Sequence, residues 1–167
     1  PAMVFSQDST AVQSPEETIR FRVISNNDYS SFAVNWGPEH RYRLGVLRTL
    51  GDYEKVYNAA AFAGTKKPYG PAADQFKKEM MVFVSRVIPA VDDVDKELRL
   101  EKVVATGTTL DVYFQYRGSA KNSTYQIKAT AAAWIPKKDY TRIRFYEGKK
   151  LEKELKFSDE TVIFPEE

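Results

Sequence analysis

The chain of 167 residues is 43% hydrophobic, 13% aromatic and 29% charged, with a formal net charge of +2 at pH 7 and no cysteine. This composition is that of a folded globular protein rather than a disordered chain, and the length favours one hydrophobic core over two small ones. The lack of cysteine excludes disulfides, thiolate nucleophiles, zinc–cysteine sites and iron–sulfur clusters, and the lack of any run near ~20 apolar residues predicts no membrane insertion.

Residues 1–16 are predicted to be a disordered tail or a remnant of cloning, followed by a single domain over residues 17–167. The chain begins Pro1-Ala2-Met3, which is an unusual start for a native open reading frame, and residues 6–15 are polar and lack a period. Such a segment is also typical of the stretch that follows a removed signal peptide. We therefore expect an extracytoplasmic protein, periplasmic or secreted, with a cytoplasmic location as the alternative.

The first elements are predicted to be three strands. Ile19, Phe21 and Val23 alternate with polar residues, which indicates one strand with these three side chains facing the core. The segments Tyr29–Trp36 and Arg41–Thr49 are expected to be the second and third strands.

A helical section follows the three strands. Asp52 is suited to cap a helix over residues 53–62, in which Tyr53 and Val56 begin an apolar stripe at helical spacing. Residues 64–70 contain two glycines and a proline, which predicts a loop, and Pro71 can begin a second short helix that ends near Lys78.

The second half of the chain is predicted to be mainly strands. Residues 80–88 are nearly all apolar, which suits a central strand covered on both faces, and residues 98–105 and 110–117 are expected to form a hairpin around Gly107. Residues 125–133 have alanines on their inner face, which suggests a helix packed close against them. Residues 141–146 and 151–155 are expected to form another hairpin. Residues 161–164 are expected to be either a short terminal strand or only a docked end of the chain.

The order of strands, then helices, then strands predicts the α+β fold class. We expect a mainly antiparallel β-sheet or meander with one or two short helices packed on one face.

Positive charge is concentrated in residues 121–150. This stretch has eight basic residues against Asp139 and Glu147: Lys121, Lys128, Lys137, Lys138, Arg142, Arg144, Lys149 and Lys150. A basic face of this density can attract a polyanion, whereas lysines on strand edges prevent edge-to-edge pairing, and we favour the second interpretation.

Aromatic and basic residues on the outer faces of these strands are the candidate binding residues: Tyr113, Arg117, Lys128, Arg142, Arg144 and Tyr146. Together they could form a stacking and cation–π surface for carbohydrate or single-stranded nucleic acid. Arginine–aromatic pairs across neighbouring strands are also common stabilising contacts, and this is the interpretation we favour.

Catalytic chemistry has little support in the sequence. His40 is the only histidine and lies in a charged, loop-like stretch without a Gly-x-Ser-x-Gly motif, so we expect neither catalysis nor zinc binding there. Asp92, Asp93 and Asp95 could bind calcium, but the loop lacks the glycine and distal glutamate of an EF-hand, so we expect a solvated turn. We predict no enzyme activity, no metal and no cofactor. An enzyme that uses two carboxylates stays open as an alternative, because their separation is set by the tertiary structure.

Two segments carry a resemblance to a known family. Gly51-Asp52-Tyr53-Glu54-Lys55-Val56-Tyr57, followed by residues 76–84 (Phe-Lys-Lys-Glu-Met-Met-Val-Phe-Val), resembles the short helix and following strand of the PrcB-like bacterial extracytoplasmic accessory proteins. The resemblance covers about residues 45–145 and lacks the Gly-Gly-Tyr turn expected after the strand. It implies a protease-associated or interaction role outside the cytoplasm and no active site.

Two functional hypotheses follow. The first is a non-enzymatic interaction domain that binds a protein and assists a protease complex. The second is a module that binds a polysaccharide or another polyanion through the basic face of residues 121–150. We do not expect nucleic acid as the partner.

Overall fold

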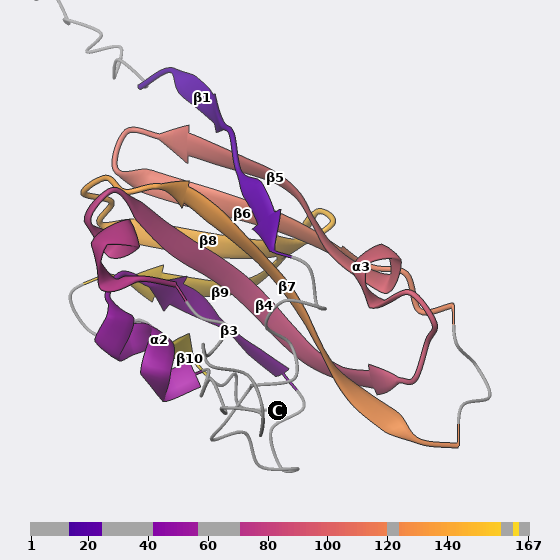
Figure 1. Cartoon of the computed structure of the whole chain (residues 1–167). Helices are drawn as coiled ribbons and strands as arrows, with labels where there is room; N and C mark the ends of the chain where they lie inside the picture. The colour runs from indigo at the N-terminus through magenta and orange to yellow at the C-terminus, as the bar shows by residue number, and fades with distance from the viewer. Residues whose placement is uncertain (1–13, 25–41, 57–70, 120–123, 158–161, 164–167) are drawn as a thin grey trace, which may run out of the picture.

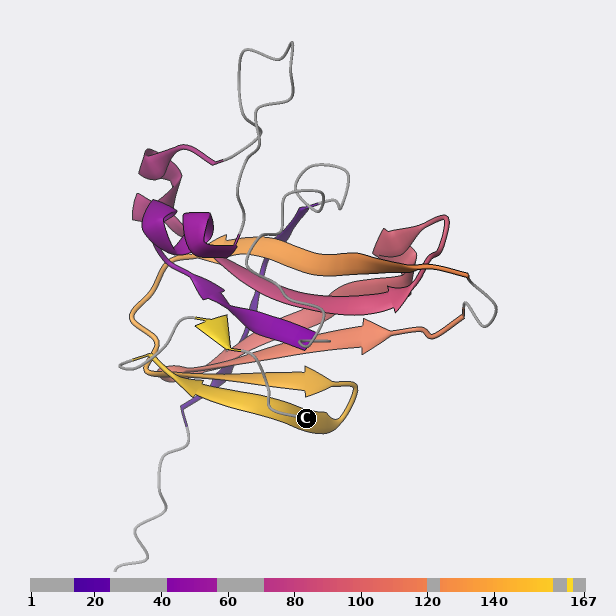
Figure 2. The same cartoon turned by 90° about the horizontal axis from the view of Figure 1, so that it is seen from below.

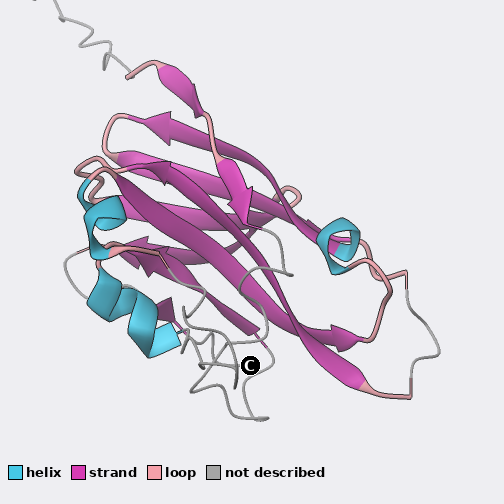
Figure 3. Cartoon of the chain, viewed as in Figure 1, coloured by secondary structure: helices cyan, strands magenta, loops and turns pink. Residues whose placement is uncertain are grey.

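The computed structural model describes residues 14–24, 42–56, 71–119, 124–157 and 162–163, which fold into two packed β-sheets with three short helical segments (Figures 1 and 3). The predictions for residues 29–36, for residues 57–62, for His40 and for the loop of residues 64–70 lie outside these described residues.

Each sheet has five strands, and we call the two sheets A and B. Sheet A has the order β1-β5-β6-β8-β9: β1 (Glu16–Ile19), β5 (Leu98–Thr106), β6 (Thr109–Tyr116), β8 (Arg142–Glu147) and β9 (Lys150–Lys156). Sheet B has the order β10-β3-β4-β7-β2: β10 (Val162–Ile163), β3 (Tyr42–Leu47), β4 (Glu79–Pro89), β7 (Gln126–Pro136) and β2 (Arg22–Ile24). Figure 2 shows the two sheets as separate layers, with helices beyond sheet B.

The main hydrophobic core lies between the two sheets. Alternate residues of each strand point into this space, as expected for a sheet with one face against a partner. The largest of these buried side chains are Leu44, Met80, Ile88, Leu98, Leu110, Phe114, Ile135 and Phe145. The α+β class with mainly antiparallel strands is confirmed. The single parallel pair in the described sheets, β6 with β8, arises because β7 lies in sheet B between them along the chain.

Strand β4 is covered on both faces, as the sequence predicts. Val82 and Val84 point into the space between the sheets, while Met81 and Phe83 point to the outer face of sheet B. There they pack beneath α2 (Leu50–Val56) and the 3₁₀ helix η2 (Ala73–Lys77), which contribute a second cluster of apolar side chains: Tyr53, Val56 and Phe76, against Ile24, Leu47, Ala132 and Trp134.

The N-terminal cap of α2 differs from the prediction. The Thr49 hydroxyl accepts from the backbone N–H of Asp52 at 3.0 Å, so Thr49 and not Asp52 caps the helix. The Asp52 carboxylate reaches back to accept from the Arg48 N–H at 3.1 Å, and the two bonds together resemble a capping box.

The predicted first strand is two strands in two sheets. Ile19 in β1 is buried in the core, but the chain then crosses from sheet A to sheet B, where β2 pairs with β7. Val23 pairs with Ala133 and faces the space between the sheets, as predicted. It is nevertheless 61% exposed, because it lines an open cleft at the edge of that space. β1 begins at Glu16, the last residue of the predicted tail, which pairs with Thr106.

The alanines of β7 lie on the face that packs against sheet A. Ala129, Ala131 and Ala133 face sheet A, where β5 lies across this face of β7. The short helix α3 (Val94–Glu97) also contacts β7, and its Val94 packs against the main core that contains these alanines, so the expected helix lies there beside β5. α2 and η2 contact the opposite face, at Ala132 and Trp134. Small side chains permit close approach of any layer, whether helix or sheet. α3 leads directly into β5.

None of the helices in the described ranges has the length and apolar character that crossing a lipid bilayer requires.

Candidate functional site

Four of the six predicted binding residues come together on the outer face of sheet A. β6 and β8 run in parallel with Tyr113 opposite Tyr146 and Asp111 opposite Arg144. The two tyrosine rings are stacked, with centroids 4.9 Å apart and planes inclined by 13°. The Lys102 ammonium lies 4.4 Å from the centroid of the Tyr113 ring, and the Arg144 guanidinium lies 5.9 Å from that of Tyr146.

The arginines of this face are held by carboxylates. Arg144 donates from Nε and Nη2 to the two Asp111 oxygens, at 2.6 and 2.9 Å, and Arg142 pairs with Glu154 at 2.8 Å. The hydrogen bond to Asp111 raises the pKa of Arg144. Arg142 and Arg144 therefore each have a negative partner, and these arginines belong to a network of cross-strand pairs rather than to an open basic surface.

The tyrosine hydroxyls share this environment. Burial, followed by the nearby Asp111 carboxylate, raises the pKa of Tyr113 and of Tyr146 above the ordinary value of 10.0. Both hydroxyls therefore remain protonated and neutral at physiological pH.

The remaining two predicted residues lie elsewhere. Lys128 has the same alternation along β7 as Ala132, which places it on the outer face of sheet B. Arg117 follows the end of β6 and lies beside α3. The structure thus groups Tyr113, Arg142, Arg144 and Tyr146 and separates them from Lys128 and Arg117.

Arg117 instead belongs to a basic pocket. Lys96 of α3, Arg99 of β5 and Gln115 of β6 line it with Arg117, around a volume of about 390 Å³. Arg99 and Gln115 are directly opposite each other in the β5–β6 hairpin, and Arg99 Nη2 donates to the Gln115 side-chain oxygen at 3.1 Å. Of these four residues, only Arg117 was predicted from the sequence to be a binding residue. The predicted hairpin around Gly107 gave the signal for Arg99 and Gln115, because its register sets them side by side.

A buried carboxylate fixes the wall of the basic pocket. Glu97 is only 3% exposed, and its two carboxylate oxygens accept from the N–H and the hydroxyl of Ser119, each at 2.6 Å. The Glu97 carbonyl also accepts from the Arg117 N–H at 2.8 Å. Between them Gly118 has a φ of +66°, a conformation that glycine adopts readily and other residues do not. These bonds hold Arg117 against the end of α3.

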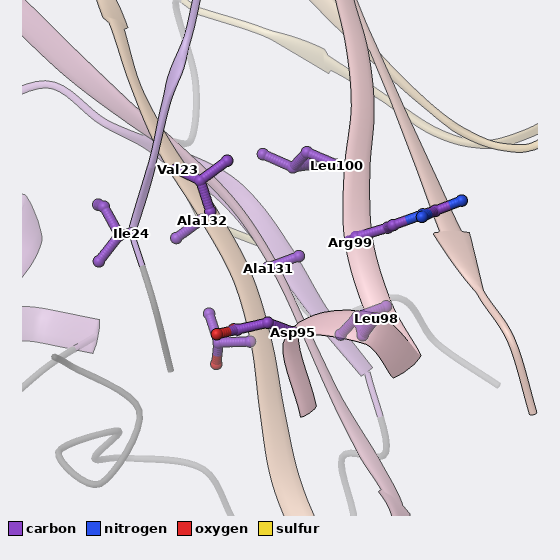
Figure 4. A pocket seen from close by; sticks show the side chains of 9 residues that line it. Val23, Ile24, Asp95, Leu98, Arg99, Leu100, Ala131 and Ala132 are labelled. Atoms are coloured by element: carbon purple, nitrogen blue, oxygen red, sulfur yellow. The ribbon is translucent and has the colours of Figure 1, made fainter. Parts of the chain in front are cut away.

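A second, apolar cleft lies on the opposite side of β5, between the two sheets (Figure 4). Its volume is about 210 Å³, and it is lined by Val23, Ile24, Asp95, Leu98, Arg99, Leu100, Thr130, Ala131 and Ala132. Val23 and Leu100 point toward each other across it, whereas the Arg99 side chain points away.

The apolar cleft lies beside the part of β5 that pairs with β6 on one side but, among the described strands, with none on the other. β1 pairs with β5 only from Val103 to Thr106 and then leaves for sheet B. Within the described chain, residues 98–102 therefore form a free edge of β5. The Arg117 N–H donates to the Glu97 carbonyl, so Glu97 directs its backbone groups toward β6. In an antiparallel pair this direction alternates along the strand, so Arg99 also faces β6, whereas Leu100 directs its backbone groups toward the free edge.

The acidic turn has a structural role. Asp93 caps α3 by accepting from the Lys96 N–H at 3.2 Å. In the part of the chain that the structure describes, no group of three or more His, Asp or Glu side chains is arranged to hold a metal ion.

Comparison with protein-family models, with curated proteins and with solved structures finds no match to this chain.

Proposed function

We propose that this protein is a non-enzymatic interaction domain that binds an extended segment of a partner protein along the free edge of β5. The observation that carries this proposal is the early departure of β1: among the described strands, none pairs with residues 98–102 of β5 on the side away from β6, beside the apolar cleft. An extended segment can add a strand to such an edge through main-chain hydrogen bonds.

The geometry of the edge sets the direction of the bound segment. β1 is antiparallel to β5, so a segment that continues its line would also be antiparallel to β5. Leu100 offers its backbone N–H and C=O to that segment, and every second side chain of the segment would point into the apolar cleft.

The cleft suits a side chain better than a cofactor. A volume of about 210 Å³ is below the roughly 300–1,000 Å³ of most small-molecule pockets. Its walls are mainly aliphatic, with Leu98, Leu100 and Ala131 among them, so an aliphatic or aromatic side chain is the group it would accept. Such an anchor, rather than a large area, is what gives a short segment its affinity.

The class of partner is suggested by the resemblance to the PrcB-like proteins, which supports a protein of an extracytoplasmic protease complex as the source of the segment. The alternative of a polysaccharide on the basic face has less support, because Arg142 and Arg144 are held by carboxylates and Lys128 lies on the other sheet.

The test begins with peptides selected for binding from a random library displayed on phage. The selected peptide is labelled, and its affinity is measured by fluorescence anisotropy for the wild type, for Val23→Asp and for Leu151→Asp. Val23 and Leu151 are both exposed apolar strand residues, at 61% and 46%, so both variants should fold, but only Val23 lines the cleft. We expect Val23→Asp to weaken binding at least about tenfold and Leu151→Asp to leave it unchanged.

Main-chain recognition is tested on the peptide itself. N-methylation at every second residue removes the N–H groups that pair with β5, so one of the two alternating sets should abolish binding and the other should be tolerated. Equal effects of the two sets, or equal effects of Val23→Asp and Leu151→Asp, would show that the segment does not bind at the free edge of β5.

A further inference from the structure

We infer that the basic pocket of Lys96, Arg99, Gln115 and Arg117 binds a small molecule that carries a tetrahedral oxyanion, a phosphate or a sulfate group. The inference does not depend on the free edge of β5. Arg99 points away from the apolar cleft, so the two sites lie on different sides of β5.

The arginines of the basic pocket differ from those on the rest of sheet A. Arg142 and Arg144 each have a carboxylate partner. Arg99 donates instead to the neutral side chain of Gln115, and within the described residues Arg117 forms no ion pair. Two guanidinium groups that line one pocket without a carboxylate between them form a ready site for an oxyanion.

The Glu97 carboxylate beside the pocket forms its hydrogen bonds with Ser119 and not, among the described residues, with these arginines. Both oxygens of Glu97 are taken by Ser119, at 2.6 Å each, and the side chain is buried. Glu97 thus positions the segment of Arg117 to Ser119 without forming an ion pair with either arginine among the described residues. Preorganised donors of this kind lose little conformational entropy when a ligand binds.

Lys96 adds a third positive charge that a ligand can recruit. Its ammonium lies 3.3 Å from Asp93, and both side chains are at least half exposed, at 75% and 50%. Exposed pairs of this kind are weak, so the ammonium can turn to an anion in the pocket at little cost.

The size of the pocket indicates more than a free ion. A volume of about 390 Å³ is within the range of small-molecule sites, so the group bound by the arginines would be attached to a larger body. The donors of Arg99, Arg117, Lys96 and Gln115 come from three different elements, and the three terminal oxygens of a phosphate or sulfate ester point in three directions, whereas the two oxygens of a carboxylate lie in one plane.

The probes are phenyl phosphate, phenyl sulfate, benzoate and benzyl alcohol, titrated into the full chain and followed by amide NMR shifts. They share an aromatic body and differ in the polar group. We expect phenyl phosphate or phenyl sulfate to bind at millimolar concentration or below, and the tighter of the two identifies the group. Benzoate should bind more weakly and benzyl alcohol not at all. Binding of benzoate as tight as that of both esters, or no binding of either ester, would overturn the inference.

Variants locate the binding. Arg99→Gln and Arg117→Gln should each weaken binding of the tighter ester at least about tenfold, because each removes a charged donor. Lys77→Gln, which removes an exposed positive charge from η2, outside the pocket, should have no effect. If Lys77→Gln weakens binding as much as the arginine variants do, the anion responds only to net charge and the inference fails.

Glu97→Gln distinguishes two explanations of binding: a pocket whose shape Glu97 maintains, and a surface that attracts anions only by its net positive charge. The substitution removes one negative charge, so attraction by net charge alone predicts stronger binding. A pocket held in shape by Glu97 predicts weaker binding, since the variant loosens the bonds to Ser119. Stronger binding by a folded Glu97→Gln variant would contradict the preorganised pocket. If this variant does not fold, the exposed Arg99 and Arg117 variants still decide the matter.

Discussion

Asp111 shows how far a single carboxylate governs the outer face of sheet A. Its side chain is 10% exposed and accepts both hydrogen bonds of the Arg144 fork. Two-fold bonds between planar charged groups are among the stronger polar contacts in proteins.

We predict that Asp111→Ala lowers the free energy of unfolding by about 1–3 kcal/mol, because it leaves the partly buried Arg144 without its partner. The comparison is Glu154→Ala, which removes the partner of Arg142 in a more exposed pair and should cost at most about 1 kcal/mol. Urea unfolding of both variants measures the difference. Equal losses would mean that the burial of Asp111 contributes nothing.

Tyr140 presents the opposite case, a buried polar group without a bond. Its ring is in the main core, and its hydroxyl has no hydrogen-bond partner among the described residues. A buried hydroxyl in this state loses its contacts with water and gains nothing in return.

Tyr140→Phe is therefore expected to leave the free energy of unfolding unchanged or to raise it. The contrasting variant is Thr130→Val, whose hydroxyl lies 2.7 Å from that of Ser85 inside sheet B and whose loss should cost about 1 kcal/mol. Thermal unfolding compares the two. A loss for Tyr140→Phe as large as that for Thr130→Val would show that the Tyr140 hydroxyl does have a partner.

At the scale of elements, α2 depends on its cap and on its packing. The described helix has seven residues, too few to be stable alone, and it contributes Tyr53 and Val56 to the cluster beneath it. Its cap orients the first turn, and the preceding strand β3 ends only three residues earlier, at Leu47.

We expect Thr49→Ala to lower the free energy of unfolding by about 1 kcal/mol, because the Asp52 N–H loses its acceptor. Thr49→Ser keeps the hydroxyl and should retain most of the stability. Denaturation of the three proteins in urea tests this order. If the serine variant were as unstable as the alanine variant, the methyl group of Thr49 and not its hydroxyl would be the stabilising part.

The elements that the sequence predicts well are those whose local pattern allows one interpretation. The apolar run of β4 favours a strand covered on both faces, which the structure confirms, and the β5–β6 hairpin follows from two alternating runs around Gly107. The crossing between β1 and β2 could not be predicted, because alternation gives the face of a residue but not the sheet to which it belongs.

The candidate sites were predicted in part for the same reason. Tyr113 and Tyr146 were expected on outer faces, and their parallel register then stacks them. The carboxylates that hold Arg142 and Arg144 were not foreseen, since pairing across strands depends on register. Lys96 could not have been assigned to the basic pocket, because it comes from α3 and meets Arg117 only through the bonds around Glu97.

For the whole molecule, the chain links the two sheets at both sides of the sandwich. β1 and β9 are the edge strands of sheet A, and each is followed along the chain by an edge strand of sheet B, β2 and β10. β1 covers part of the edge of β5 and protects that part from pairing with other chains. This cover is incomplete, because β1 pairs only with residues 103–106 of β5. The proposed binding site lies along the other part of the strand, residues 98–102.

The stability of the whole chain should fall at alkaline pH through its buried tyrosines. The pKa values of Tyr113, Tyr140 and Tyr146 are raised in the folded protein, in each case mainly by burial, while in the unfolded chain they are about 10. Below the unfolded value all three are protonated in both states, so their contribution is constant. As the pH rises above it, the unfolded chain loses these protons first, and the free energy of unfolding decreases.

We predict that Tyr113→Phe/Tyr146→Phe makes the free energy of unfolding less sensitive to pH above about pH 10, and that adding Tyr140→Phe reduces the dependence further. Urea unfolding from about pH 8 to about pH 11 gives the profile, and the absorbance of ionised tyrosine reports the titration directly. The double variant loses the hydroxyls but keeps the stacked rings, so any change in slope reflects proton binding rather than packing. A double variant whose stability declines with pH as steeply as that of the wild type would show that these two tyrosines are not the groups responsible, and that other groups with raised pKa values, Tyr140 first among them, cause the alkaline loss.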